Sequence, residues 1–228
     1  MPGPGPEGKQ FRLLWLAVAA LFLLNAGTIA YLVIGTKSEA DPHGHGEPMV
    51  DVPVAELLQP GPLEDMSIGD PNAPNVVVEY ASMTCPHCAD FHQKLLPDLK
   101  TKYVDTGKVR FIFREFPLDK LAALASMVAR CSGKEGYFPM IESLFKSQEI
   151  WAGAEDPMPK LFDVAKQGGF SQEKFDQCVE DQDLFDKIVQ VRKRANESFK
   201  VNSTPSFFVN GKPLEHPEDV EDFAALLE

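Results

Sequence analysis

The feature that most limits the possible folds is an apolar segment that leads directly into two closely spaced cysteines. Residues 76–81 are apolar except for Glu79, which is typical of a strand buried on both faces. Residues 85–88 then read Cys-Pro-His-Cys. Large side chains recur every four residues after this motif and predict one face of a helix: Phe91, Leu95, Leu99 and Tyr103. Cys85 and Cys88 are therefore expected at a strand-to-helix junction.

The next segments predict a return strand and then a helical region. Residues 109–114 alternate in polarity, which favours a second strand ending before Pro117. Pro97 is expected to kink the intervening helix, because proline lacks an N–H donor. A strand–helix–strand unit builds a parallel pair. Helices are expected around 118–132, 136–147, 159–168, 171–180 and 183–199, with Ser171 as an N-cap.

The C-terminal segment predicts a hairpin and a last helix. Residues 206–209 form a short apolar run, and Asn210-Gly211 is a strong signal for a tight turn. A short return strand is expected at 212–214. Residues 217–227 then predict an amphipathic helix with Pro217 at its start and acids in its first turn.

The N-terminus carries a long apolar segment. Residues 13–34 contain no charged side chain, and as a helix they would extend about 33 Å, enough to cross a hydrocarbon core of about 30 Å. Lys9 and Arg12 precede the segment, which predicts a cytoplasmic N-terminus and an exported remainder. A cleaved signal peptide ending near Ala30 is the alternative. Both interpretations place the rest of the chain in an oxidising compartment.

Residues 35–69 are polar and rich in proline and glycine, and they predict a linker with at most a short helix near Val54. His43 and His45 lie in this linker, but a flexible glycine-rich segment is a poor scaffold for a metal site. The formal net charge of -12 argues against a nucleic-acid partner, because such a protein presents a basic surface to the phosphates.

The spacing of Cys85 and Cys88 indicates thiol–disulfide chemistry. At a helix N-terminus, free N–H groups and the helix dipole favour an anion, so Cys85 is expected to be the reactive thiolate. Cys88, one turn later, is expected to resolve mixed disulfides. Pro86 suits the first helical turn, and His87 adds positive charge near the sulfurs. A zinc site is the alternative, but no second CxxC pair is present.

The other two cysteines lie in the predicted helical region. Cys131 and Cys178 are expected to form a structural disulfide, because free thiols do not persist in an oxidising compartment. Such a disulfide would close a loop of about 47 residues, and on the chain-entropy model this would stabilise the fold by about 4 kcal/mol. A second redox pair is the alternative.

Two motifs in the same order resemble the DsbA family: residues 79–88 with the CxxC pair, and Ser203-Thr204-Pro205 after a long helical segment. The resemblance covers residue 70 to the C-terminus. It implies an α/β thioredoxin fold at 70–117 and 202–228 with a helical insertion at 118–201. A cytoplasmic lead at 1–12, the anchor at 13–34 and the linker at 35–69 would precede it. The branch resembled carries an additional cysteine pair in its helices.

The same resemblance implies roles for three more residues. A cis peptide bond is expected before Pro205, where Thr204 and Pro205 would face the CxxC pair and bind the substrate backbone. Glu79 would move protons for Cys88, with Arg110 or Arg114 as its partner; a purely structural ion pair is the alternative. Thr204 departs from the apolar residue of the oxidase that gives the family its name, and it also resembles disulfide isomerases.

These observations predict a bacterial protein anchored in the inner membrane, with a catalytic part in the periplasm that donates the Cys85–Cys88 disulfide to exported proteins. Its expected partners are reduced or unfolded exported proteins and, by resemblance, a DsbB-type membrane reoxidase. No cofactor and no metal are expected. A disulfide isomerase or reductase is the first alternative, and a membrane-tethered chaperone-like binding protein is the second.

Overall fold

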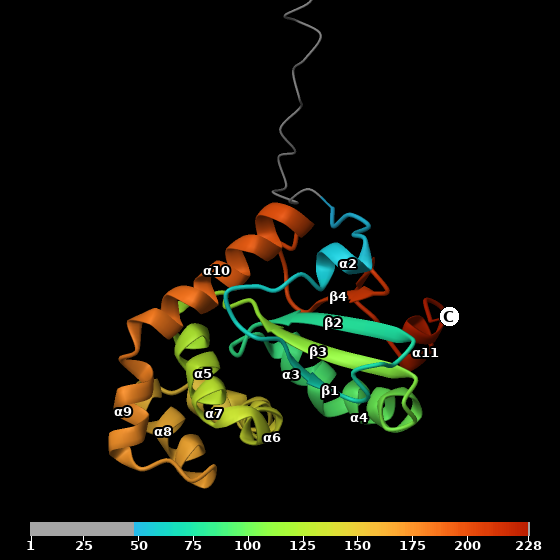
Figure 1. The fold of residues 1–228 in the computed structure, drawn as a ribbon. Coiled ribbons are helices and arrows are strands. Elements are labelled where there is room, and N and C mark those ends of the chain that lie inside the picture. The colour runs from blue at the N-terminus through green and yellow to red at the C-terminus, as the bar shows by residue number, and fades with distance from the viewer. Residues whose placement is uncertain (1–47, 228) are drawn as a thin grey trace, which may run out of the picture. The chain divides into compact units, whose positions relative to one another are not determined.

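The computed structural model describes residues 48–227, which contain a five-stranded sheet in the order β1-β3-β2-β4-β5 (Figure 1). The parallel pair at its centre is β2 (Asn75–Ala81) with β3 (Val109–Glu115). The neighbours β1 (Met66–Ile68) and β4 (Ser206–Val209) run antiparallel to them, and β5 (Lys212–Glu215) completes the edge. Both predicted central strands are present, and β2 is buried along its whole length.

The connection from β2 to β3 is one helical stretch with two π-helical sections. It consists of α3 (Pro86–Asp90), η1 (Phe91–Leu95), α4 (Leu96–Leu99) and η2 (Lys100–Val104). The helix was expected to kink near Pro97, and instead a π-helical section with wider turns lies on each side of α4, which contains Pro97. Each π-helical section shifts the buried face by one residue. Leu96 and Val104 are therefore buried where the four-residue period predicted Leu95 and Tyr103.

Six helices separate β3 from β4, and Figure 1 shows α5 to α9 to one side of the sheet and α10 running back from them toward α2. They are α5 (Lys120–Cys131), α6 (Gly133–Lys146), α7 (Gln148–Ala152), α8 (Pro157–Gln167), α9 (Gln172–Val179) and α10 (Gln182–Phe199). Ser171 caps α9 as predicted, since its side chain accepts the N–H of Lys174. The short α7 has no counterpart among the predicted helices.

The C-terminal hairpin has the predicted turn, with Asn210 and Gly211 both at positive φ (51° and 82°). The last helix is shorter than predicted: α11 spans Val220–Ala224 rather than 217–227. Asp219 and Asp222 form a capping box there, and this fixes the start of the helix downstream of Pro217.

The sheet has an apolar layer on each face. One layer joins Val77, Phe111 and Phe113 to the helical stretch after the CxxC motif and to α5 and α6. The other joins Val78 and Ile112 to the end of α10 and to buried residues upstream of β1. The strands therefore read as continuous apolar runs because both of their faces are covered.

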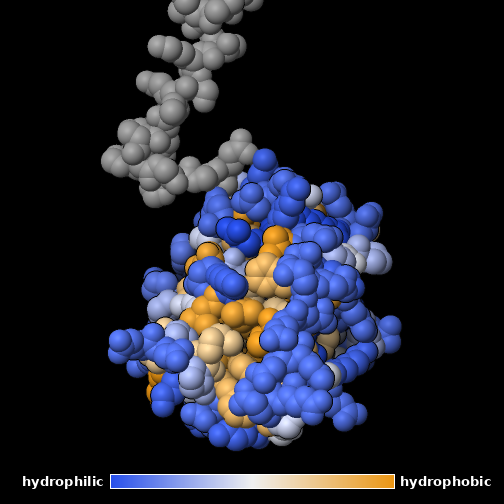
Figure 2. Space-filling view, turned by 90° about the vertical axis from the view of Figure 1, so that its left-hand side faces the viewer, coloured by the Kyte–Doolittle hydropathy of each residue, from blue (hydrophilic) through white to orange (hydrophobic). Residues whose placement is uncertain are grey.

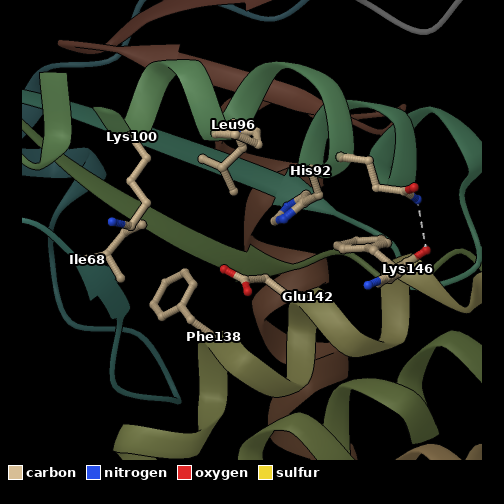
Figure 3. A pocket seen from close by; sticks show the side chains of 10 residues that line it. Ile68, His92, Leu96, Lys100, Phe138, Glu142 and Lys146 are labelled. Carbon is tan, nitrogen blue, oxygen red and sulfur yellow. Dashed lines mark hydrogen bonds between the residues drawn. The ribbon is translucent and has the colours of Figure 1, made fainter. Parts of the chain in front are cut away.

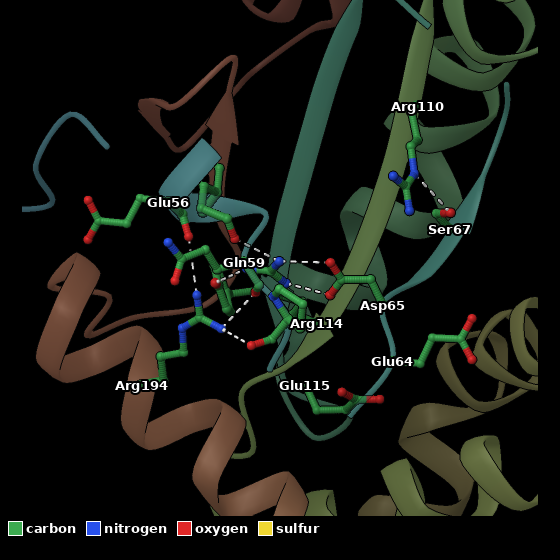
Figure 4. Close-up of polar contacts among 12 residues, drawn as sticks. Glu56, Gln59, Glu64, Asp65, Ser67, Arg110, Arg114, Glu115 and Arg194 are labelled. Carbon is green, nitrogen blue, oxygen red and sulfur yellow. Dashed lines mark hydrogen bonds and ion pairs between the residues drawn. The ribbon is translucent and has the colours of Figure 1, made fainter. Parts of the chain in front are cut away.

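The predicted linker is wrong for residues 48–69, although the short helix expected near Val54 is present. Met49, Val52 and Leu57 are buried on the second face of the sheet, α2 (Val54–Leu57) packs there, and β1 pairs with β3. Arginines bind this segment to the fold, as Figure 4 shows. Arg114 donates to Asp65 and to the carbonyl of Leu57, and Arg194 donates to the carbonyls of Glu56, Gln59 and Pro60. Because the binding groups are mostly backbone carbonyls, composition alone does not reveal them.

The predicted anchor at 13–34 and the linker residues 35–47 lie outside the described residues. Between residues 48 and 227, none of the helices has both the length and the apolar character needed to cross a bilayer.

Candidate active site

Cys85 and Cys88 lie at the junction of β2 and α3, as predicted. Cys85 is the N-cap residue with extended backbone, Pro86 begins the helix, and Cys88 follows one turn later. Both cysteines are free thiols and both are buried, Cys85 with 6% of its surface exposed and Cys88 with none. Pro86 and His87 are exposed between them. The pair is thus presented at the edge of the core, with only Cys85 open to a partner.

The environment of Cys85 favours its thiolate. A hydrogen bond from the Cys88 thiol is the largest contribution, and the Thr204 hydroxyl and the backbone N–H groups of Cys88 and His87 add to it. Together they outweigh burial and lower the pKa of Cys85 to about 5. His87 lowers the pKa of Cys85 through its backbone N–H. The helix N-terminus therefore acts as predicted, while the exposed imidazole is not among these groups.

Cys88 has the opposite environment. Burial raises the pKa of Cys88 well above its usual value, and its hydrogen bond to Cys85 and the negative charge of Glu79 raise it further. One sulfur is therefore anionic at neutral pH while the other keeps its proton. Such a separation suits a nucleophile and a resolving thiol.

Two side chains from the helical region hold the loop before Cys85. Asp119 accepts a hydrogen bond from the Thr84 hydroxyl at 2.6 Å. The buried amide of Gln148, in α7, donates to the carbonyl oxygens of Met83 and Cys85 at 2.8 and 2.9 Å. Sequence reasoning missed Gln148, because a single glutamine in a short helix has no distinguishing pattern. The helical region therefore positions the CxxC motif directly.

The loop before β4 lies against the nucleophile. β4 pairs with β2, so the residues that enter β4 lie beside the residues that leave β2. The Thr204–Pro205 peptide bond is cis, and the carbonyl oxygen of Thr204 lies 3.2 Å from the Cys85 sulfur. The structure thus brings together the two motifs on which the DsbA resemblance rests.

A pocket of about 330 Å³ adjoins this contact. Its lining includes His87, Phe91, Pro205 and Phe207, together with residues just after β5 such as His216.

Exposed apolar side chains also occur near the motif, on Leu118 before α5 and on Ile150 in α7. Figure 2 shows one face of the molecule on which apolar side chains form a continuous area bordered by hydrophilic ones. Surfaces of this kind bind other chains.

Glu79 is fully buried and pairs with His92, not with Arg110 or Arg114. Glu79 Oε2 lies 2.8 Å from His92 Nε2. The predicted arginine partners are wrong because of strand periodicity: Glu79 aligns with Phe113, so Arg110 and Arg114 project to the other face of the sheet. Burial raises the pKa of Glu79, and His92 opposes this rise.

Sequence reasoning also missed His92, although a signal was available. It lies four residues after Cys88 on the same helical stretch, next to the buried Phe91. A polar residue on the buried side of a helix calls for a partner in the core.

The remaining cysteines form a disulfide between α5 and α9. Cys131 and Cys178 are bonded to each other, and 47 positions separate them in the sequence. All four cysteines are therefore accounted for as one dithiol and one disulfide.

Comparison with known proteins places this arrangement in a family. Residues 63–228 match the family described as thioredoxin, which is well over half of the chain. The crystal structure of alpha-DsbA1 from Wolbachia pipientis superposes with a TM-score of 0.68 at 35% sequence identity, covering 75% of this chain and 92% of that one. The chain belongs to the DsbA-like branch of the thioredoxin family.

Other relatives of this DsbA-like protein carry related names. A putative protein-disulfide oxidoreductase of Rickettsia bellii is 36% identical over 153 residues, which cover 67% of this chain. The matched region is 59% of that relative's length, so the alignment leaves a large part of it unmatched. A probable disulfide bond formation protein D of Bacillus cereus is 27% identical over 93% of both chains. The α/β thioredoxin-like fold and the predicted family are thus confirmed.

Proposed function

We propose that this DsbA-like protein is a protein thiol–disulfide oxidoreductase that works as an oxidase, donating a Cys85–Cys88 disulfide to reduced exported proteins. The observation that carries the proposal is the stabilised thiolate at Cys85, whose pKa is lowered to about 5 chiefly by the hydrogen bond from Cys88. Stabilising this thiolate favours the reduced form of the pair. The disulfide form is then a strong oxidant, because it gains that stabilisation when it accepts electrons.

The reaction follows from the different positions of the two sulfurs. A substrate thiolate attacks the Cys85 sulfur, since Cys88 is fully buried. The disulfide bond breaks, its electron pair leaves with Cys88, and Cys88 takes up a proton. A second substrate thiolate then attacks the substrate sulfur of the mixed disulfide and releases Cys85 as a thiolate. Cys85 is a good leaving group because its pKa is low.

The substrate chain is proposed to bind along Thr204 and Pro205 and in the adjoining pocket. Thr204 and Pro205 lie against Cys85, and the apolar rings of Phe91 and Phe207 line the pocket beside them. Apolar side chains bordered by polar ones, here including Asp90 and Glu218, suit the binding of unfolded chains of varied sequence. Pro86 and His87 would form the exposed edge on which the substrate rests.

The location of the protein belongs to the same proposal. The apolar segment 13–34 is proposed to anchor the chain in a bacterial inner membrane with residues 48–227 in the periplasm. A membrane reoxidase of the DsbB type would then restore the disulfide. Anchoring would confine both proteins to one surface and raise their encounter rate.

A disulfide isomerase is the second candidate, and Thr204 favours it. The Thr204 side chain helps to lower the pKa of Cys85, and a threonine before this proline also resembles the motif of disulfide isomerases. An isomerase acts in its reduced form, so it needs the dithiol rather than the disulfide.

Two substrates separate the candidates. The oxidised protein is mixed with reduced ribonuclease, and the reduced protein with scrambled ribonuclease. The proposal predicts rapid disulfide formation in the first assay and weak unscrambling in the second. Strong unscrambling with slow oxidation would assign the isomerase instead, and Cys85→Ser should abolish either activity. Full activity of Cys85→Ser would contradict both and favour a chaperone-like role.

A further inference from the structure

The buried pair of Glu79 and His92 continues away from the CxxC motif into a second pocket. This pocket has a volume of about 420 Å³ and lies between the helical stretch 91–100 and α6. His92 lines it, and Figure 3 shows the His92 ring directed from its helix into the space bordered by Leu96, Phe138 and Glu142. The pocket containing Pro205 has different lining residues throughout.

Glu79 and His92 are joined by one hydrogen-bonded contact, and each side chain has a second polar atom beyond it. Glu79 Oε2 contacts His92 Nε2, while Glu79 Oε1 and His92 Nδ1 are buried without a hydrogen-bond partner in the described part of the chain. The pair therefore has one unused atom at each end. Buried polar atoms without partners are costly, and they persist mainly where they have a role.

Three aromatic rings pack around the imidazole of His92. The ring of Phe145 lies 4.4 Å from that of His92 between centroids, and Phe91 and Phe113 lie at 5.5 and 5.6 Å. Such walls keep water away from the Glu79 contact. A proton that leaves Glu79 can pass through a group that spans these walls, and the imidazole is such a group.

The charged and titratable groups around the pair come from four elements. β2 supplies Glu79, η2 supplies Lys100, and α6 supplies Tyr137, Glu142 and Lys146. Cys85 is the N-cap of α3, and Cys88 lies within that helix. Lys100 is paired with Asp105, and Glu142 and Lys146 are exposed at the rim. Glu79 acts on Cys88, because an ionised Glu79 carboxylate raises the pKa of the Cys88 thiol.

We propose that His92 is a positioning residue that relays protons between Glu79 and the pocket lined by Leu96, Phe138 and Glu142. The proton that Cys88 gains and loses would then pass through this pocket, away from the substrate surface. The inference rests on the proposed function, because only a pair that cycles between dithiol and disulfide needs such a path.

Both halves of the cycle balance with this relay. When substrate attack releases Cys88 as a thiolate, Glu79 gives it a proton, His92 Nε2 gives one to Glu79, and Nδ1 takes one from the pocket. When Cys88 later attacks a mixed disulfide on Cys85, it first gives its proton to Glu79. His92 takes that proton on Nε2 and releases another from Nδ1, and the electron pair of the broken bond leaves on the partner's sulfur. The second half of the cycle returns the imidazole proton from Nδ1 to Nε2, so the ring need not rotate between turnovers.

The test measures how fast Cys88 resolves a mixed disulfide. The reduced full-length protein is mixed with oxidised glutathione, and acid-quenched mass spectrometry follows the glutathione adduct on Cys85 between pH 5 and 8. His92→Gln keeps an N–H donor for Glu79 but cannot carry a proton through its side chain. We expect its adduct to persist at least about tenfold longer, since general acid–base assistance contributes on the order of 10²- to 10⁴-fold.

Chemical rescue separates proton transfer from packing. His92→Ala leaves a space that opens toward the pocket, and added imidazole should restore the rate in proportion to its concentration. Pyrazole has the same shape but stays neutral, so it should not restore the rate. Gln93→Ala is the matched control, because Gln93 lines the same pocket without contacting Glu79. Its adduct should decay at the wild-type rate.

Each outcome has one meaning. Equal decay in His92→Gln and the wild type at every pH, or equal rescue by pyrazole and imidazole, would overturn the relay. If His92→Ala does not fold, the His92→Gln comparison decides. A wild-type protein that never forms or resolves the adduct would instead contradict the proposed function.

Discussion

The sulfur of Cys85 lies 3.2 Å from the carbonyl oxygen of Thr204. This contact joins Cys85, at the start of α3, to the loop before β4, and 119 positions separate the two residues in the sequence. The Thr204 side chain acts on the same sulfur, since its hydroxyl helps to lower the pKa of Cys85. The residue that would contact the substrate backbone therefore also contributes to the reactivity of the nucleophile, after the larger contribution of Cys88.

Replacing Thr204 by valine should make the protein a weaker oxidant. Thr204→Val removes the hydroxyl and keeps the shape, so the pKa of Cys85 should rise and the thiolate should lose stabilisation. Each unit of pKa corresponds to about 1.4 kcal/mol, or about 30 mV for a two-electron couple. The potential should therefore fall by up to about 30 mV per unit. Thiolate absorbance at 240 nm and glutathione titration measure the two quantities, and Thr204→Ser should behave as the wild type.

The reduced and oxidised proteins should differ in their response to pH. The folded pKa of Cys85 is below its unfolded value, so the thiolate stabilises the reduced fold at high pH and this contribution is lost as pH falls toward about 5. The melting temperature of the reduced form, relative to that of the oxidised form, should therefore rise between pH 5 and 8. A difference that is constant over this range would show that Cys85 is not stabilised as a thiolate.

Gln148 should contribute to stability through its two bonds to the CxxC loop. Gln148→Ala removes the side-chain donor to the buried carbonyl of Met83 and leaves the Cys85 carbonyl with the N–H of Ala89 alone, which costs about 1–3 kcal/mol. Urea unfolding of the oxidised protein measures this loss. Gln182→Ala is the control, because Gln182 is exposed and bonds only to Asp186 in its own helix. Equal unfolding midpoints in the two variants would show that Gln148 does not hold the loop.

The disulfide between Cys131 and Cys178 should be structural. Replacing both by serine removes a closed loop whose ends are 47 positions apart, and the fold should lose up to about 4 kcal/mol. The oxidation of reduced ribonuclease per folded molecule should stay close to the wild-type value. A large loss of that activity at full folding would favour the alternative, in which these cysteines form a second redox pair.

Local patterns in the sequence predicted the parts of the fold that depend on neighbouring residues. The buried strand before Cys85, the capped helix after Ser171 and the Asn210-Gly211 turn all follow from short-range rules. The position of Cys85 at the helix N-terminus follows from the same rules, and so does much of its reactivity.

The parts that were missed depend on which segments meet in space. The partner of Glu79 required knowledge of which face of β2 it occupies, and only the register with β3 supplies that. The four-residue period after Cys88 failed because π-helical turns, which carry no simple sequence signal, shift the buried face. Polar composition hid the folded segment 48–69, because arginines distant in sequence bind its backbone carbonyls.

The reduction potential of the Cys85–Cys88 pair tests the central claim most directly. The full-length protein is equilibrated in glutathione buffers of known ratio, and the fraction of reduced pair is measured by thiol alkylation and mass spectrometry. The account predicts a potential more oxidising than about −200 mV, since the Cys85 thiolate stabilises the reduced form. A potential near about −270 mV, typical of the reducing protein thioredoxin, would contradict it.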